Sequence, residues 1–207
     1  MKKYVSVLLF SFLFMGKQIT FAQDTSYTKQ ILQERSKKNI EFKDETHSPL
    51  EAKQRQTFQE LAYFPLDESF KVEAIFIKNE DPKPFQMKTS TERLPVYVVF
   101  GKVKFQLQGK DFELNVYQSR DLLKKPGFKD YLFIPFTDQT SGNETYGGGR
   151  YIDCRIPQTD TLLLDFNTAY NPYCAYSHTF SCPIPPKINK LRIKVLAGEK
   201  NFEKEEN

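Results

Sequence analysis

The chain has 207 residues, with 30 Lys and Arg against 26 Asp and Glu, and a formal net charge of +4. Three of the basic residues lie within the first 22 residues, where no acidic residue occurs, so the rest of the chain carries 27 basic and 26 acidic side chains. This balance predicts neither a nucleic-acid partner nor attraction to an anionic membrane. The remaining ~185 residues suit one domain with a sizeable core.

The first 22 residues have the three parts of a cleavable signal peptide. Two lysines follow Met1, the segment Tyr4–Gly16 is apolar except for two serines, and Thr20–Ala22 presents small residues where a signal peptidase cuts. The apolar part is shorter than the roughly 20 residues that span a bilayer. We therefore expect cleavage before Gln23 and a periplasmic or secreted protein that does not insert into a membrane after cleavage.

Two helices are expected before the first strand. The segment Thr28–Phe42 is rich in charged and amide side chains and has a thin apolar edge, which is typical of a surface helix. A second helix is predicted from Ser48, which can cap it, and Pro49, which suits its first turn. We divide the chain into a signal peptide (1–22), a helical segment (23–60), a β domain (61–199) and a charged tail (200–207).

A β-hairpin is the clearest local structure. Apolar and polar residues alternate on both sides of Gly109 and Lys110, which we expect to form a two-residue turn. That turn would make three apolar pairs on one face: Leu107 with Phe112, Phe105 with Leu114, and Val103 with Val116.

Six further strands are predicted, with turn residues and no helices between them. They are Lys71–Lys78, Pro95–Phe100, Tyr131–Phe136, Tyr151–Ile156, Thr161–Phe166 and Leu191–Leu196. This spacing favours a mainly β fold, a single antiparallel sandwich or barrel-like domain after one or two N-terminal helices. The last strand alternates cleanly and is expected to close the sheet.

A glycine-rich connection at 140–153 is the first candidate site. Three successive glycines, including Gly148, lie among polar residues, and no Lys-Ser/Thr follows them as a phosphate-binding loop requires. One interpretation is a tight crossover in which Arg150 pairs with Glu144 or Asp153. The other is a site in which Arg150 binds an anion beside a carboxylate, with Tyr146 nearby.

A long aromatic connection at 164–186 is the second candidate. Asp165, Asn167 and Asn171 suit Asx-type turns. Cys174 and Cys182 are a candidate disulfide across a short loop in an oxidising compartment.

The third cysteine, Cys154, is interpreted as a small buried apolar residue. His178 lies between the other two cysteines, but the spacing matches no trusted zinc motif. We therefore expect no metal and no cofactor, and a Cys-His nucleophile is disfavoured because the two residues are so close in sequence.

These connections resemble the bacterial family catalogued as domain of unknown function 1684. The resemblance rests on the strings 62–67, 136–153, 164–176, 182–186 and 197–199 and covers most of the chain after about Gln33. It implies no particular activity. It does single out a set of positions: Glu144, Tyr146, Gly147, Gly148, Gly149, Arg150, Asp153, Asp165, Asn167, Tyr170, Asn171, Cys174 and Cys182.

Three classes of function stay open at this point. The first is a binding module in which Arg150, Tyr146 and Asn171 hold a small polar or anionic ligand. The second is a hydrolase-type enzyme with Glu144, Asp153 or Asp165 as general base and Arg150 stabilising negative charge. The third is an envelope scaffold that binds a partner through a sheet edge or the N-terminal helices.

Overall fold

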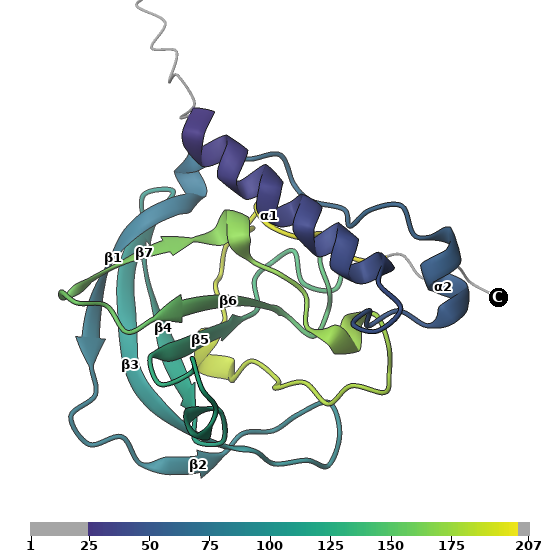
Figure 1. The fold of residues 1–207 in the computed structure, drawn as a ribbon. Helices are drawn as coiled ribbons and strands as arrows, with labels where there is room; N and C mark the ends of the chain where they lie inside the picture. Colours follow the sequence, from purple (N-terminus) through teal and green to yellow (C-terminus); the bar gives the residue numbers. More distant parts are fainter. Residues whose placement is uncertain (1–24, 203–207) are drawn as a thin grey trace, which may run out of the picture.

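The computed structural model describes residues 25–202, and its main feature is a seven-stranded antiparallel sheet that curls into a half-barrel (Figure 1). The strand order is β6-β5-β4-β3-β1-β7, and β2 pairs with β3 off this path. The strands are β1 (Lys71–Lys78), β2 (Pro84–Gln86), β3 (Val96–Leu107), β4 (Lys110–Ser119), β5 (Tyr131–Phe136), β6 (Arg150–Arg155) and β7 (Thr161–Asp165). The predicted mainly β fold is confirmed, in its barrel-like form.

The concave face of the sheet holds the main hydrophobic core. Side chains from six strands, β1 and β3 to β7, meet there, and most have no exposed surface; examples are Ala74, Val103, Leu114 and Ile134. Strands β1 and β5 begin and end as predicted, because polar turn residues flank both apolar segments and mark the strand limits. The predicted strand at 95–100 continues into the hairpin as one strand, β3, and the short β2 was not predicted.

The hairpin forms, but its predicted turn is wrong by one residue. The turn residues are Gln108 and Gly109, which have φ angles of 50° and 73°. Positive φ at both central positions is the requirement of a type I′ turn, which matches the twist of the two strands. The pairs are consequently Leu107 with Lys110, Phe105 with Phe112, and Val103 with Leu114. A register change of two residues leaves the same side chains on the core face.

The segment Leu191–Leu196 is not a strand, so the prediction that it closes the sheet is wrong. Its apolar side chains alternate into the core as expected. Its backbone groups, however, bond outside any ladder: the Val195 amide donates to Asp138 Oδ2 at 2.7 Å, and the Ile193 carbonyl accepts from Gln139 at 3.0 Å. The segment therefore fills the half-barrel without joining its sheet.

Helix α1 (Thr25–Lys43) confirms the first predicted helix and crosses the open side of the half-barrel, near the two edge strands β6 and β7 (Figure 1). Near its start, the Tyr27 hydroxyl donates to Asp165 Oδ2 at 2.7 Å. Two apolar residues of the helix, Ile31 and Phe42, are buried. Among residues 25–202, no helix has the length and apolar character needed to cross a membrane.

Helix α2 (Ala52–Thr57) begins later than predicted. Its N-cap is Glu51, whose backbone N–H donates to the Gln54 side chain at 3.1 Å. Ser48 instead stabilises the preceding turn, where its hydroxyl donates to the Phe42 carbonyl at 2.6 Å and accepts from the Leu50 N–H at 3.1 Å. A serine followed by proline therefore capped a turn here, not a helix.

Candidate functional site

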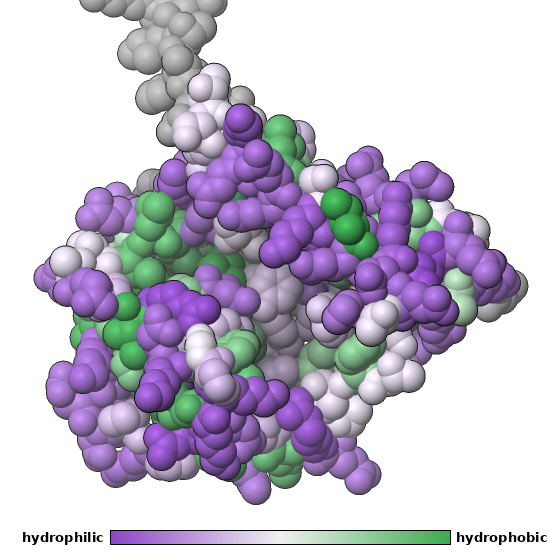
Figure 2. All heavy atoms as spheres, viewed as in Figure 1, coloured by the Kyte–Doolittle hydropathy of each residue, from purple (hydrophilic) through white to green (hydrophobic). Residues whose placement is uncertain are grey.

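A cavity of about 560 Å³ lies between α1, strand β6 and the segment that follows β7. Figure 2 shows a recess on this face below α1, with pale atoms in its depth and hydrophilic ones around it. Aromatic rings form much of its lining: Phe42, Tyr63, Tyr151, Tyr170 and Tyr173. Helix α1 supplies the charged side chains of the opposite wall: Glu34, Arg35, Lys37, Lys38 and Glu41.

Asp153 on β6 places a carboxylate on the cavity wall. Its Oδ1 accepts hydrogen bonds from the hydroxyls of Tyr131 and Tyr170, each at 2.7 Å. Among the described residues, none donates to Oδ2. Burial raises the pKa of Asp153, and the two tyrosine hydrogen bonds oppose that shift. The Asp153 side chain is nevertheless accessible to solvent, because it lines the open cavity.

Two cations that line the cavity, Lys38 and Arg35, have contacts of their own within the protein. Lys38 donates to Glu199 Oε2 at 2.8 Å, and its ammonium lies 4.9 Å from the centre of the Tyr170 ring. Arg35 lies 4.2 Å above the Tyr63 ring and donates to backbone carbonyls at 3.3 and 3.4 Å. These contacts fasten α1 over the cavity. Two polar atoms of the lining residues, Asp153 Oδ2 and the buried Arg35 Nε, have no hydrogen-bond partner among the described residues.

Glu199 is a buried polar centre that the sequence interpretation did not assign to a site. Only 1% of its surface is exposed. Besides Lys38, it accepts from the Tyr176 hydroxyl and from the Asn171 side chain, the latter at 3.0 Å. Asn171, predicted to bind a ligand, is fully buried and engaged in this network. The Ala-Gly-Glu string that ends at Glu199 was the signal that could have revealed this role.

Arg150 does not face the cavity, so the prediction that it binds an anionic ligand is not supported. The side chain is fully buried, and it donates to the carbonyls of Ala197, Glu199 (3.2 Å) and Val195 (2.9 Å). Its charge partner is Asp138 at 3.5 Å, not Glu144 or Asp153 as expected. Burial lowers the pKa of Arg150.

Two predicted carboxylates and one amide have structural partners. Glu144 pairs with Lys194 at 2.6 Å, and this contact lowers the pKa of Glu144. Asp165 Oδ1 accepts from the Asn167 N–H at 2.9 Å, in an Asx turn as expected. The Asn167 side chain also exchanges two hydrogen bonds with the backbone of Asp67, at 2.8 and 3.1 Å, while part of Asn167 reaches the cavity wall.

In the glycine-rich connection the backbone passes very close to neighbouring side chains. A Cβ at Gly148 would lie 2.3 Å from the Tyr146 ring, so only glycine fits against that ring. The Tyr146 hydroxyl in turn lies 3.7 Å from Cys174 Sγ.

Of the predicted ligand-binding residues, the structure brings Asp153, Asn167 and Tyr170 together at the cavity and places the others elsewhere.

The fold and the site define a β half-barrel protein in which an N-terminal helix covers an aromatic cavity with a carboxylate on its wall. The chain belongs to the family described as "Protein of unknown function (DUF1684)", whose model matches residues 56–200. It is similar to an uncharacterized protein of Haloarcula marismortui solved by solution NMR, with 35% sequence identity and a TM-score of 0.66. That match covers 84% of this chain and 94% of the other. A search of curated proteins gave no match.

Proposed function

We propose that the protein is an exported binding module whose small-molecule ligand occupies the cavity beneath α1. The observation that carries this proposal is Asp153, which lines an aromatic cavity and has one carboxylate oxygen without a donor among the described residues. The volume of about 560 Å³ falls in the range of small-molecule sites, roughly 300–1,000 Å³. Aromatic walls with few convergent polar groups are also typical of such sites.

The chemistry of the cavity favours a ligand that donates hydrogen bonds. Asp153 supplies an acceptor, Lys38 is paired with Glu199, and Arg150 is buried. Arg35 donates to two backbone carbonyls and keeps one free donor, its buried Nε, which a ligand hydroxyl can meet. The tyrosine rings offer flat apolar surface against which the body of a ligand can pack. The ligand class we propose is therefore an amine or a polyol, in place of the anion expected from the sequence.

A thermal-shift experiment tests this proposal with two panels, one of small amines and polyols and one of organic acids. The variants are Asp153→Asn and, as a matched control, Asp130→Asn, whose exposed carboxylate pairs with Arg155 at 2.8 Å. We expect a compound of the first panel to raise the melting temperature of the wild type and of the control but not of Asp153→Asn. Equal stabilisation of all three proteins would reject Asp153 as the binding group.

The hydrolase arrangement expected from the sequence receives less support. It paired Arg150 with a carboxylate, but Arg150 is buried and only Asp153 of the three candidate bases lines the cavity. The scaffold hypothesis stays a prediction. The observation in its favour is that Ile75 and Leu163 expose 57% and 59% of their surface on neighbouring strands, β1 and β7.

A further inference from the structure

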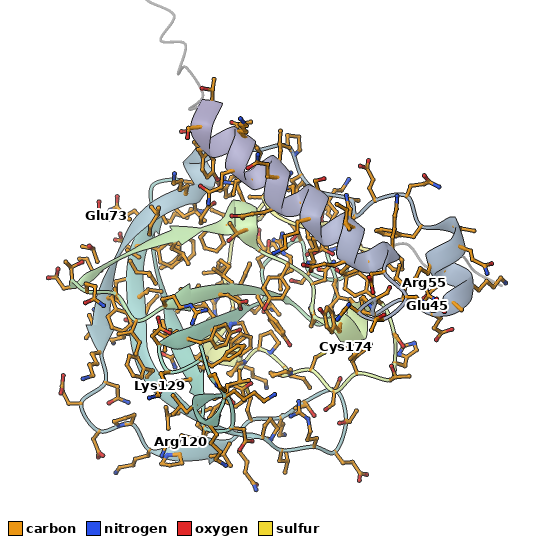
Figure 3. All side chains as sticks on the ribbon, viewed as in Figure 1. Glu45, Arg55, Glu73, Arg120, Lys129 and Cys174 are labelled. Atoms are coloured by element: carbon orange, nitrogen blue, oxygen red, sulfur yellow. The ribbon has the colours of Figure 1, made fainter. Side chains whose placement is uncertain are left out.

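Two cysteines meet beside the cavity. Cys174 lies in the short helix η4 (Tyr173–Ala175), below the C-terminal end of α1 (Figure 3), and Cys182 precedes a proline-rich stretch. The backbone N–H of Cys174 donates to Cys182 Sγ at 3.2 Å. The two thiols are free, with 8% and 9% of each residue exposed. The third cysteine, Cys154, lies on β6 opposite Leu132.

The groups around the pair favour the thiolate form of one cysteine, Cys174. A side-chain hydrogen bond from Cys182, together with the Tyr146 hydroxyl at 3.7 Å, lowers the pKa of Cys174 to about 6. The same shared proton raises the pKa of Cys182. Burial raises the pKa of Cys154 to about 12. Since the thiolate is the reactive form, Cys174 is the cysteine best prepared to react.

We infer that Cys174 and Cys182 are a redox pair that a small-molecule disulfide converts into an intramolecular disulfide. The Cys174 thiolate attacks one sulfur of the external disulfide, whose S–S bond breaks and releases one thiol after it takes up a proton. Cys182 then loses its proton and attacks Cys174 Sγ, which releases the second thiol. The two cysteines are oxidised by two electrons in total, and the external disulfide is reduced to two thiols.

Oxidation would fix one wall of the cavity. Pro172, Tyr173 and Cys182 all line it, and the new bond would tie η4, which contains Tyr173, to the segment at Cys182. The redox pair does not depend on the proposed ligand, because its contacts lie within the protein.

The test is a thiol count on the purified protein after incubation with dithiothreitol or with oxidised glutathione. Alkylation under denaturing conditions and mass spectrometry should find three thiols in the reduced protein and one after oxidation. Chymotrypsin, which cuts after Tyr176 and Phe180, should leave the peptides of Cys174 and Cys182 joined. The oxidised protein should melt roughly 5 °C or more above the reduced one, because the cross-link constrains the unfolded chain.

Two variants separate the pair from general oxidation. Cys154→Ala should lose both remaining thiols on oxidation. Tyr146→Phe should move the pH profile of Cys174 alkylation to higher pH, because the variant lacks a hydrogen bond to the thiolate. Three thiols after oxidation, or a linkage through Cys154, would overturn the inference, and a failure of the amine and polyol screen would leave it unaffected.

Discussion

The guanidinium of Arg150 lies 3.5 Å from the carboxylate of Asp138, and neither side chain has any exposed surface. Arg150 is at the start of edge strand β6, whereas Asp138 follows β5 and also accepts from the Val195 N–H at 2.7 Å. The pair therefore joins the sheet to the C-terminal segment that fills the half-barrel. This is a role in stability.

We expect Arg150→Met to cost about 3–5 kcal/mol of unfolding free energy, because it leaves a buried carboxylate and backbone carbonyls without their donor. Urea denaturation measures this loss. The matched control is Arg155→Met on the same strand, whose pair with Asp130 is half exposed at 2.8 Å. The control should lose less than about 1 kcal/mol. Similar losses for both variants would contradict the structural role.

Gly149 should tolerate no side chain. It has a φ of +85°, and an added Cβ would lie 2.5 Å from the Phe136 carbonyl oxygen and 2.7 Å from the Pro185 ring. Gly127 has a similar φ of +80° but open space around it. We expect Gly127→Ala to cost about 1–2 kcal/mol through backbone strain alone, and Gly149→Ala to cost about 3 kcal/mol or more. Equal melting temperatures of the two variants would show that the close contacts carry no cost.

The Asp153 carboxyl gives a prediction about pH. Burial raises its pKa in the folded state above the unfolded value, so ionisation opposes folding. This cost is absent below the unfolded pKa and develops fully as pH rises through the folded pKa. Asp153→Asn keeps an acceptor for the tyrosine hydroxyls and should change stability by about 1 kcal/mol or less at pH 7.

The urea midpoint of Asp153→Asn should therefore rise relative to the wild type between about pH 4 and the raised pKa, and then stay level. Parallel pH profiles for the two proteins would mean that the folded environment does not disfavour the carboxylate.

The N-terminal segment gives a prediction about processing. Residues 1–22 lie outside the described structure, so only the sequence bears on their role. Expression of the full chain in a secreting bacterium should yield a protein that begins at Gln23, as determined by intact mass and N-terminal sequencing. Ala22→Arg, which places a large charged side chain before the cleavage point, should block this processing. A protein that still begins at Met1 would refute the signal peptide.

The cavity could be predicted only in part. Asp153, Asn167 and Tyr170 were named from two connections, and all three line it. Its other wall comes from α1, whose Tyr27 meets Asp165 from 138 residues away. Nothing local in a surface helix indicates which loop it will cover.

The sequence by itself determined most of the strands and the presence of the hairpin, because apolar patterns and turn residues act between near neighbours in the chain. The strand limits of β1 and β5 and the core face of Val103 follow from such local patterns. Tertiary structure decided the partners of the buried polar groups. From the sequence, Arg150 was either paired with a carboxylate or available to an anion, and Leu191–Leu196 was expected to be a strand. In the structure, the Arg150 guanidinium donates to the Val195 carbonyl of that segment. A buried donor bonds to whichever acceptor the fold brings near it, and distance along the chain carries no information about that choice.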